Sequence, residues 1–81
     1  MLGGPMRGPD RSEIYEYVRA HPDTDIRRIV EDLYPDATPY ETRYMKTRIL
    51  HHLSNLRKQG RITVSAHIGG SDHRNFWRAV E

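Results

Sequence analysis

Hydrogen-bond donors and aromatic rings recur on one side of the stretch from residue 38 to residue 60. At about 100° per residue, a helix over residues 39–59 separates its apolar side chains from its polar ones. The apolar face carries Met45, Ile49, Leu53 and Leu56, with Leu50 on its flank. The opposite face has neither an acid nor an aliphatic residue and consists of Tyr40, Arg43, Tyr44, Thr47, His51, Ser54 and Lys58. Guanidinium, hydroxyl and imidazole groups on such a face match the base edges and phosphates that the DNA major groove exposes.

Both ends of this helix are marked by residues that stop or start helices. Thr38 can cap the first free N–H groups, and Glu41, three residues later, completes a capping box. Pro39 suits the first helical position, because its missing N–H would have no partner there. Two cations occupy the last turn, where they favour the helix dipole, and Gly60 then permits a left-handed stop.

Charge is distributed unevenly along the 81 residues, although the net charge is only +2. Residues 1–37 hold five basic and eight acidic side chains, whereas residues 38–61 hold six basic side chains against Glu41 alone. A charge gradient that peaks on one capped helix indicates a surface for a polyanion. The alternative interpretation is a basic face that is merely solvated.

Composition limits the domain organisation and the cellular location. A chain of this length forms one small domain, so we expect a flexible tail over the glycine- and proline-rich residues 1–9 and a folded domain over residues 10–81. Cysteine is absent, which excludes disulfides and thiolate metal sites. No apolar run reaches the length of a membrane helix, and the N-terminus lacks a signal peptide core. We therefore expect an intracellular protein, either cytoplasmic and nucleoid-associated or nuclear.

Two shorter helices are predicted before the long one, near residues 10–20 and 25–33. The first has an apolar stripe of Ile14, Tyr17 and Val18, and Asp10 and Glu13 have the spacing of a capping box. The second follows a cap within residues 23–25 and ends before a proline.

After Gly60 the apolar period changes to two. Residues 61–68 alternate strictly, which predicts a strand with one buried face formed by Ile62, Val64, Ala66 and Ile68. Residues 69–72 have the composition of a turn, and residues 75–80 form a return strand. Either Phe76 and Val80 or Trp77 and Ala79 point inward on that strand, and we favour Trp77 covering the end of the core.

Three helices followed by a β-hairpin, with a long, basic and capped third helix, resemble the winged helix-turn-helix family. The resemblance covers roughly residues 10–80 and includes residues 53–62, where a leucine pair and a basic pair precede a glycine and the first wing strand. It implies an α+β fold in which helix 39–59 enters the major groove and hairpin 61–80 is the wing. The DNA-binding residues would then be Tyr40, Arg43, Tyr44, Thr47, Arg48, His51, Lys58, His73 and Arg74.

Some of these residues have other interpretations. Arg43 can hold a guanine, remain solvated, or pair with Glu41 or Asp36. Tyr44 can meet DNA or cover the second helix. His67 and residues 71 and 72 are further wing candidates by position.

Catalysis, metal binding and cofactor binding are not expected. The chain has no nucleophile elbow, phosphate loop or facing carboxylate pair. His51 and His52 are adjacent, so a helix points them about 100° apart rather than at one ion.

We therefore predict a small transcriptional regulator that binds double-stranded DNA sequence-specifically. A homodimer is one option, because one domain covers few base pairs. The alternative function is a winged-helix protein–protein module within a transcription or replication assembly.

Overall fold

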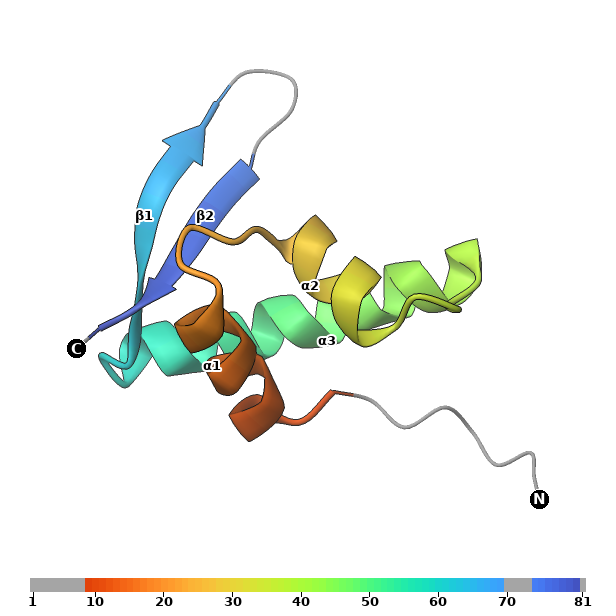
Figure 1. The fold of residues 1–81 in the computed structure, drawn as a ribbon, viewed down its shortest axis with the longest axis horizontal. Coiled ribbons are helices and arrows are strands. Elements are labelled where there is room, and N and C mark those ends of the chain that lie inside the picture. Colours follow the sequence, from red (N-terminus) through yellow and green to blue (C-terminus); the bar gives the residue numbers. More distant parts are fainter. Residues whose placement is uncertain (1–8, 70–73, 81) are drawn as a thin grey trace.

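Three helices precede a two-stranded antiparallel hairpin in the computed structural model, which describes residues 9–69 and 74–80. The elements are α1 (Arg11–Ala20), α2 (Ile26–Leu33), α3 (Pro39–Lys58), β1 (Ile62–Ile68) and β2 (Arg74–Ala79). This α+β layout confirms the predicted fold class and is consistent with a winged-helix arrangement. Figure 1 shows α1 and α2 lying against the long α3, with the hairpin standing at the C-terminal end of α3.

The core forms where the apolar stripe of α3 meets the other elements. Its fully or nearly buried side chains are Ile14, Tyr17, Val18, Ile29, Val30, Met45, Ile49, Leu53, Leu56, Ile62 and Trp77. The helical period therefore predicted the buried faces of α1 and α3 correctly. Within the described part of the chain, no helix is long and apolar enough to cross a membrane.

The capping box at the start of α3 is confirmed. The backbone N–H of Glu41 donates to Thr38 Oγ1 at 3.2 Å, and the backbone N–H of Thr38 donates to Glu41 Oε1 at 2.8 Å. Gly60 has φ of 75°, so the predicted left-handed stop is also confirmed. The capping box therefore determines where α3 begins, and the left-handed conformation of Gly60 determines where it ends.

The capping box predicted for α1 is wrong. Asp10 does cap the helix, but it accepts from the backbone N–H of Ser12 at 2.8 Å. The Glu13 carboxylate instead accepts from the hydroxyl of Tyr34 at 3.1 Å. The hydrogen-bond partner of Glu13 is therefore Tyr34, at the end of α2, and not the backbone N–H of Asp10. The predicted tail lies outside the described residues except for Pro9, which is buried with its carbonyl oxygen 2.9 Å from His52 Nε2.

A β-bulge divides the hairpin into two halves. Val64 lies opposite Trp77 and Ala66 lies opposite Phe76, so Ser65 is an extra residue in β1. Consecutive residues of β2 point to opposite faces, and the bulge therefore moves Ala66 away from the face that carries Val64. The predicted single buried face of β1 is wrong beyond Ser65, where Ala66 and Ile68 are exposed.

Thr24 extends the hairpin by one further bridge. Its backbone N–H donates to the Trp77 carbonyl at 3.1 Å, and the Trp77 N–H donates to the Thr24 carbonyl at 2.7 Å. β2 therefore lies between β1 and the loop that precedes α2. Trp77 is 5% exposed, which confirms that it covers the end of the core. The predicted turn at 69–72 lies outside the described residues apart from Gly69.

Candidate nucleic-acid interface

The outward face of α3 is exposed as the helical period predicted. Its exposed side chains are Tyr40, Arg43, Tyr44, Thr47, Arg48, His51, Ser54 and Lys58. Tyr40 is 83% exposed and Tyr44 is 49% exposed, so neither ring belongs to the core. The Thr47 hydroxyl donates to the Arg43 carbonyl at 3.3 Å, which leaves its methyl group and its acceptor lone pairs to a ligand.

Cations on α3 have no acidic partners among the described residues. Ion pairs between described residues join Arg19 to Glu16, Arg74 to Asp25 and Arg78 to Asp23. None of these pairs includes the α3 cations Arg43, Lys46, Arg48, Arg57 and Lys58. The capping box holds Glu41, the one acid of α3. Of the interpretations of Arg43, pairing with Glu41 or Asp36 is thus not observed in the structure.

Two adjoining hollows lie beside the cations of α3, where α3 faces α2 and the loop that joins the two helices. Both are lined by Thr42 and Lys46, and their volumes are about 420 and 410 Å³. Arg27 of α2 and Glu31 line the first, and Arg43 lines the second. Arg27 and Lys46 were not among the predicted site residues, because the sequence does not show how α2 lies against α3.

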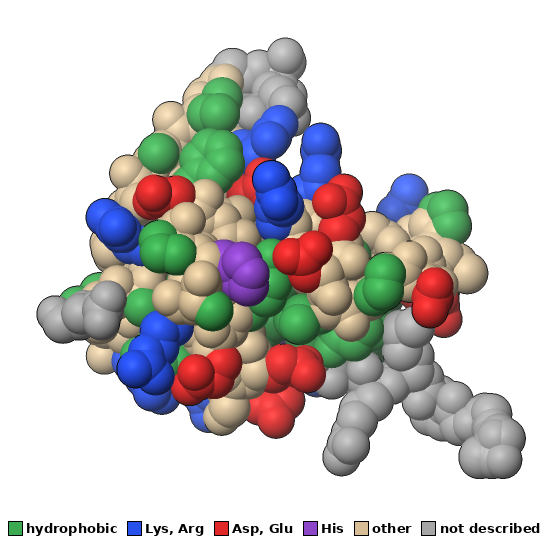
Figure 2. Space-filling view, viewed as in Figure 1, with side chains coloured by type: hydrophobic (Ala, Val, Ile, Leu, Met, Phe, Trp, Pro, Cys, Tyr) green, Lys and Arg blue, Asp and Glu red, His purple; other side chains and the backbone are tan. Residues whose placement is uncertain are grey.

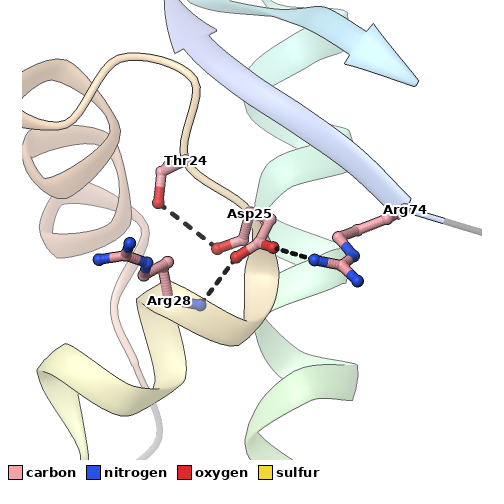
Figure 3. A network of polar contacts seen from close by, with 4 residues as sticks. All are labelled: Thr24, Asp25, Arg28 and Arg74. Carbon is pink, nitrogen blue, oxygen red and sulfur yellow. Dashed lines mark hydrogen bonds and ion pairs between the residues drawn. The ribbon is translucent and has the colours of Figure 1, made fainter. Parts of the chain in front are cut away.

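By contrast, both arginines of β2 form ion pairs with aspartates of the loop before α2. Arg74 Nη1 lies 3.3 Å from Asp25 Oδ2 (Figure 3), and Arg78 Nε lies 3.9 Å from Asp23 Oδ1. Asp25 also accepts from the backbone N–H of Arg28 at 2.9 Å, which caps α2. The predicted contact residue His73 and the wing candidates at 71 and 72 lie outside the described residues.

A smaller hollow of about 200 Å³ separates the hairpin from α3. It is lined by Ile26, Leu50, His67, Arg74, Asn75 and Trp77. Leu50 is half exposed here, and His67 Nδ1 lies 2.6 Å from Asn75 Oδ1 across the two strands. The bulge explains why His67 faces this hollow, since it places His67 on the same face as Trp77.

Acids are concentrated on the other helices. Figure 2 shows acidic side chains spread over α1 and α2 on the face in view. Burial and a hydrogen bond to Glu13 raise the pKa of Tyr34 to about 12. Burial and a hydrogen bond to Asp32 also raise the pKa of Tyr17. Both hydroxyls therefore remain protonated at neutral pH, and their hydrogen bonds to these carboxylates link α1 to α2 and its C-terminal end.

Histidines do not gather into a metal site in the part of the chain that the structure describes. No group of three or more possible ligands lies together there. The rings of His51 and His52 are 6.4 Å apart and inclined at 69°. His52 is already engaged with the Pro9 carbonyl.

No family model, curated protein or solved structure matches the chain.

Proposed function

We propose that the protein binds double-stranded DNA sequence-specifically through the exposed face of α3 and acts as a small transcriptional regulator. The observation that carries this proposal is the set of five α3 cations without acidic partners among the described residues. A solvated basic face usually carries interspersed acids, and this face has none except the capping Glu41. Unpaired cations supply the sequence-independent affinity for phosphates that precedes any discrimination between bases.

Base discrimination would come from the first half of α3. Arg43 can donate two hydrogen bonds to a guanine, and the methyl group of Thr47 can contact a thymine. Tyr40, Tyr44 and His51 share this face and can contact phosphates or sugars. The rigid capping box orients them, because it determines the first turn of the helix.

Binding of labelled duplexes, followed by fluorescence anisotropy, tests this function. A random duplex should bind with a dissociation constant of about 10⁻⁴ to 10⁻⁶ M at physiological salt. A duplex selected from a random pool should bind at least about 10³-fold more tightly. Failure of both duplexes to bind at low salt would exclude the proposal. The stoichiometry of the selected complex would also show whether a homodimer binds.

A second candidate function, a protein–protein module, is favoured by the hairpin. Beyond the bulge, Ile68 is 46% exposed on the face that also carries the partly exposed Phe76. Exposed apolar side chains that cluster can form the centre of a protein interface. This function would replace DNA binding if the duplex titration gave no signal while the protein remained folded.

A further inference from the structure

Cations outnumber acids in the two hollows where α3 faces α2. Figure 1 shows α2 lying beside the first half of α3. Arg27 of α2 and Lys46 of α3 line the hollow of about 420 Å³, and Glu31 is the one acid among the described residues that line it. Arg43 and Lys46 line the adjoining hollow of about 410 Å³, with no acid among its described lining residues. Positive charge from two helices therefore converges on one depression of the surface.

Arg27 and Lys46 retain their charge for a ligand. Neither forms an ion pair with a described residue. Arg27 is exposed and Lys46 is partly buried. A partly buried lysine packs its stem on apolar surface while its ammonium group stays in contact with water. Thr42 lines both hollows together with Lys46, and its hydroxyl can add a neutral donor.

Lys46 lies on a flank of α3, between the buried stripe and the outward face. It follows the buried Met45 and precedes Thr47 of the outward face, each by one step of about 100° around the helix axis. The major groove is about 12 Å wide, and an α-helix with its side chains is about 10–12 Å across. A helix that fills the groove therefore has its flanks beside the phosphates that border the groove.

We infer that Arg27 and Lys46 together hold one phosphate of the DNA backbone at the hollow between α2 and α3. This inference rests on the proposed function and adds a contact from α2 to those of the α3 face. Phosphate oxygens accept hydrogen bonds from guanidinium, ammonium and hydroxyl groups, which Arg27, Lys46 and Thr42 supply. Because phosphates carry no sequence information, this contact positions α3 in the groove without selecting a base.

Substitution by glutamine removes each charge and keeps part of the stem, and glutamine is a good helix former. The variants are Arg27→Gln, Lys46→Gln and the double variant. Anisotropy titrations with a random duplex at about 50 and 200 mM salt measure their binding. Each single variant should bind more weakly than the parent protein. The ratio of affinities for a selected and a random duplex should stay unchanged in all three, because the lost contact is the same for every sequence.

The salt dependence of the double variant shows whether the two cations share a phosphate. Loss of one phosphate contact lowers the magnitude of the slope of log affinity against log salt by about 0.9. The double variant should therefore lose about 3.5-fold less affinity than the parent between the two salt concentrations. Contacts to two separate phosphates would lower the slope by about 1.8, which corresponds to a difference of about 12-fold.

Arg28→Gln is the matched control, with the same change in net charge one residue away on α2. Arg28 is also exposed, but it lines neither of the two hollows. Its backbone N–H, which donates to Asp25 at the start of α2, is kept in the variant. The slope and the affinity should therefore remain those of the parent protein.

Three results would overturn the inference. These are parent-like affinity in either single variant, a slope change in the double variant of about zero or about 1.8, and an equal loss in Arg28→Gln. Circular dichroism verifies the fold, and Lys46→Met, which keeps an unbranched stem, replaces Lys46→Gln if that variant does not fold. Failure of the proposed function looks different, because the parent protein itself would not bind DNA, and both ideas would then be wrong.

Discussion

α3 and the hairpin both carry arginines, but the two regions differ in what those arginines contact. On α3 the cations, which include Arg43, Arg48 and Lys58 of the outward face, have no acidic partners among the described residues. On the hairpin, Arg74 and Arg78 each pair with an aspartate of the loop before α2. The hairpin also contributes Trp77 to the core, whereas the outward face of α3 contributes nothing to it.

This difference shows that counting charges does not locate a binding surface. Among the described residues, the arginines of β2 form ion pairs with aspartates, whereas the cations of α3 form none. An ion pair within the protein must be broken before its arginine can meet a phosphate, which lowers the gain from the new contact. We therefore propose α3 as the surface for DNA and a mainly structural role for the described hairpin.

The largest expected effect tests the structural role of the hairpin. Trp77→Ala should lower the free energy of unfolding by about 3–5 kcal/mol, because a buried aromatic side chain leaves a cavity. Urea denaturation measures this change. Tyr40→Ala removes an exposed aromatic from α3 and should change stability by less than about 0.5 kcal/mol. Equal effects of the two substitutions would remove the distinction between the regions.

Arg43→Ala tests the binding role of α3. It should cost about 1–3 kcal/mol of binding free energy on a selected duplex and relax the preference at one base pair. Stability should not change, since the side chain is exposed and has no ion pair with a described residue. Normal affinity in this variant would place the DNA surface elsewhere.

Thr38→Ala tests whether the capping box stabilises the first turn of α3. The loss of the hydroxyl leaves the Glu41 N–H without its partner and should cost about 1 kcal/mol of stability. Thr38→Ser keeps the hydroxyl and is the matched control. A parent-like urea midpoint for the alanine variant would show that the first turn does not depend on the capping box.

The smallest effect concerns single phosphate contacts. Lys58→Ala should reduce the magnitude of the salt slope by about 0.9 without altering base preference. Arg78→Ala removes a hairpin arginine that is paired with Asp23 and should leave the slope as in the parent. Anisotropy on a random duplex at several salt concentrations distinguishes the two. A larger effect at Arg78 would reverse the comparison between α3 and the hairpin.

Features that depend on near neighbours could be predicted from the sequence. The capping box of α3 joins residues three apart, and its helical period alone places Arg43 and Thr47 on the outward face. The change of period at Gly60 likewise predicts the hairpin. The resemblance to winged helices follows from the order of these local elements.

Features that depend on distant partners could not be predicted. Asp25 and Arg74 are 49 residues apart, and their residue types are too common to suggest a pair. Glu13 has capping-box spacing yet bonds to Tyr34, because folding brings the end of α2 within reach. The alternation of residues 61–68 gives no sign of a bulge at Ser65, which is defined only by the pairing with β2.

The bulge has a further consequence for how copies of this protein meet at high concentration. β1 has no strand beside its outer edge in the described part of the chain, so its backbone groups there could pair with another molecule. Regular pairing of this kind leads to aggregation, and it requires an uninterrupted row of amide and carbonyl groups. The extra residue at Ser65 breaks that row and bends the strand, and β1 is thereby a poor template for a foreign strand.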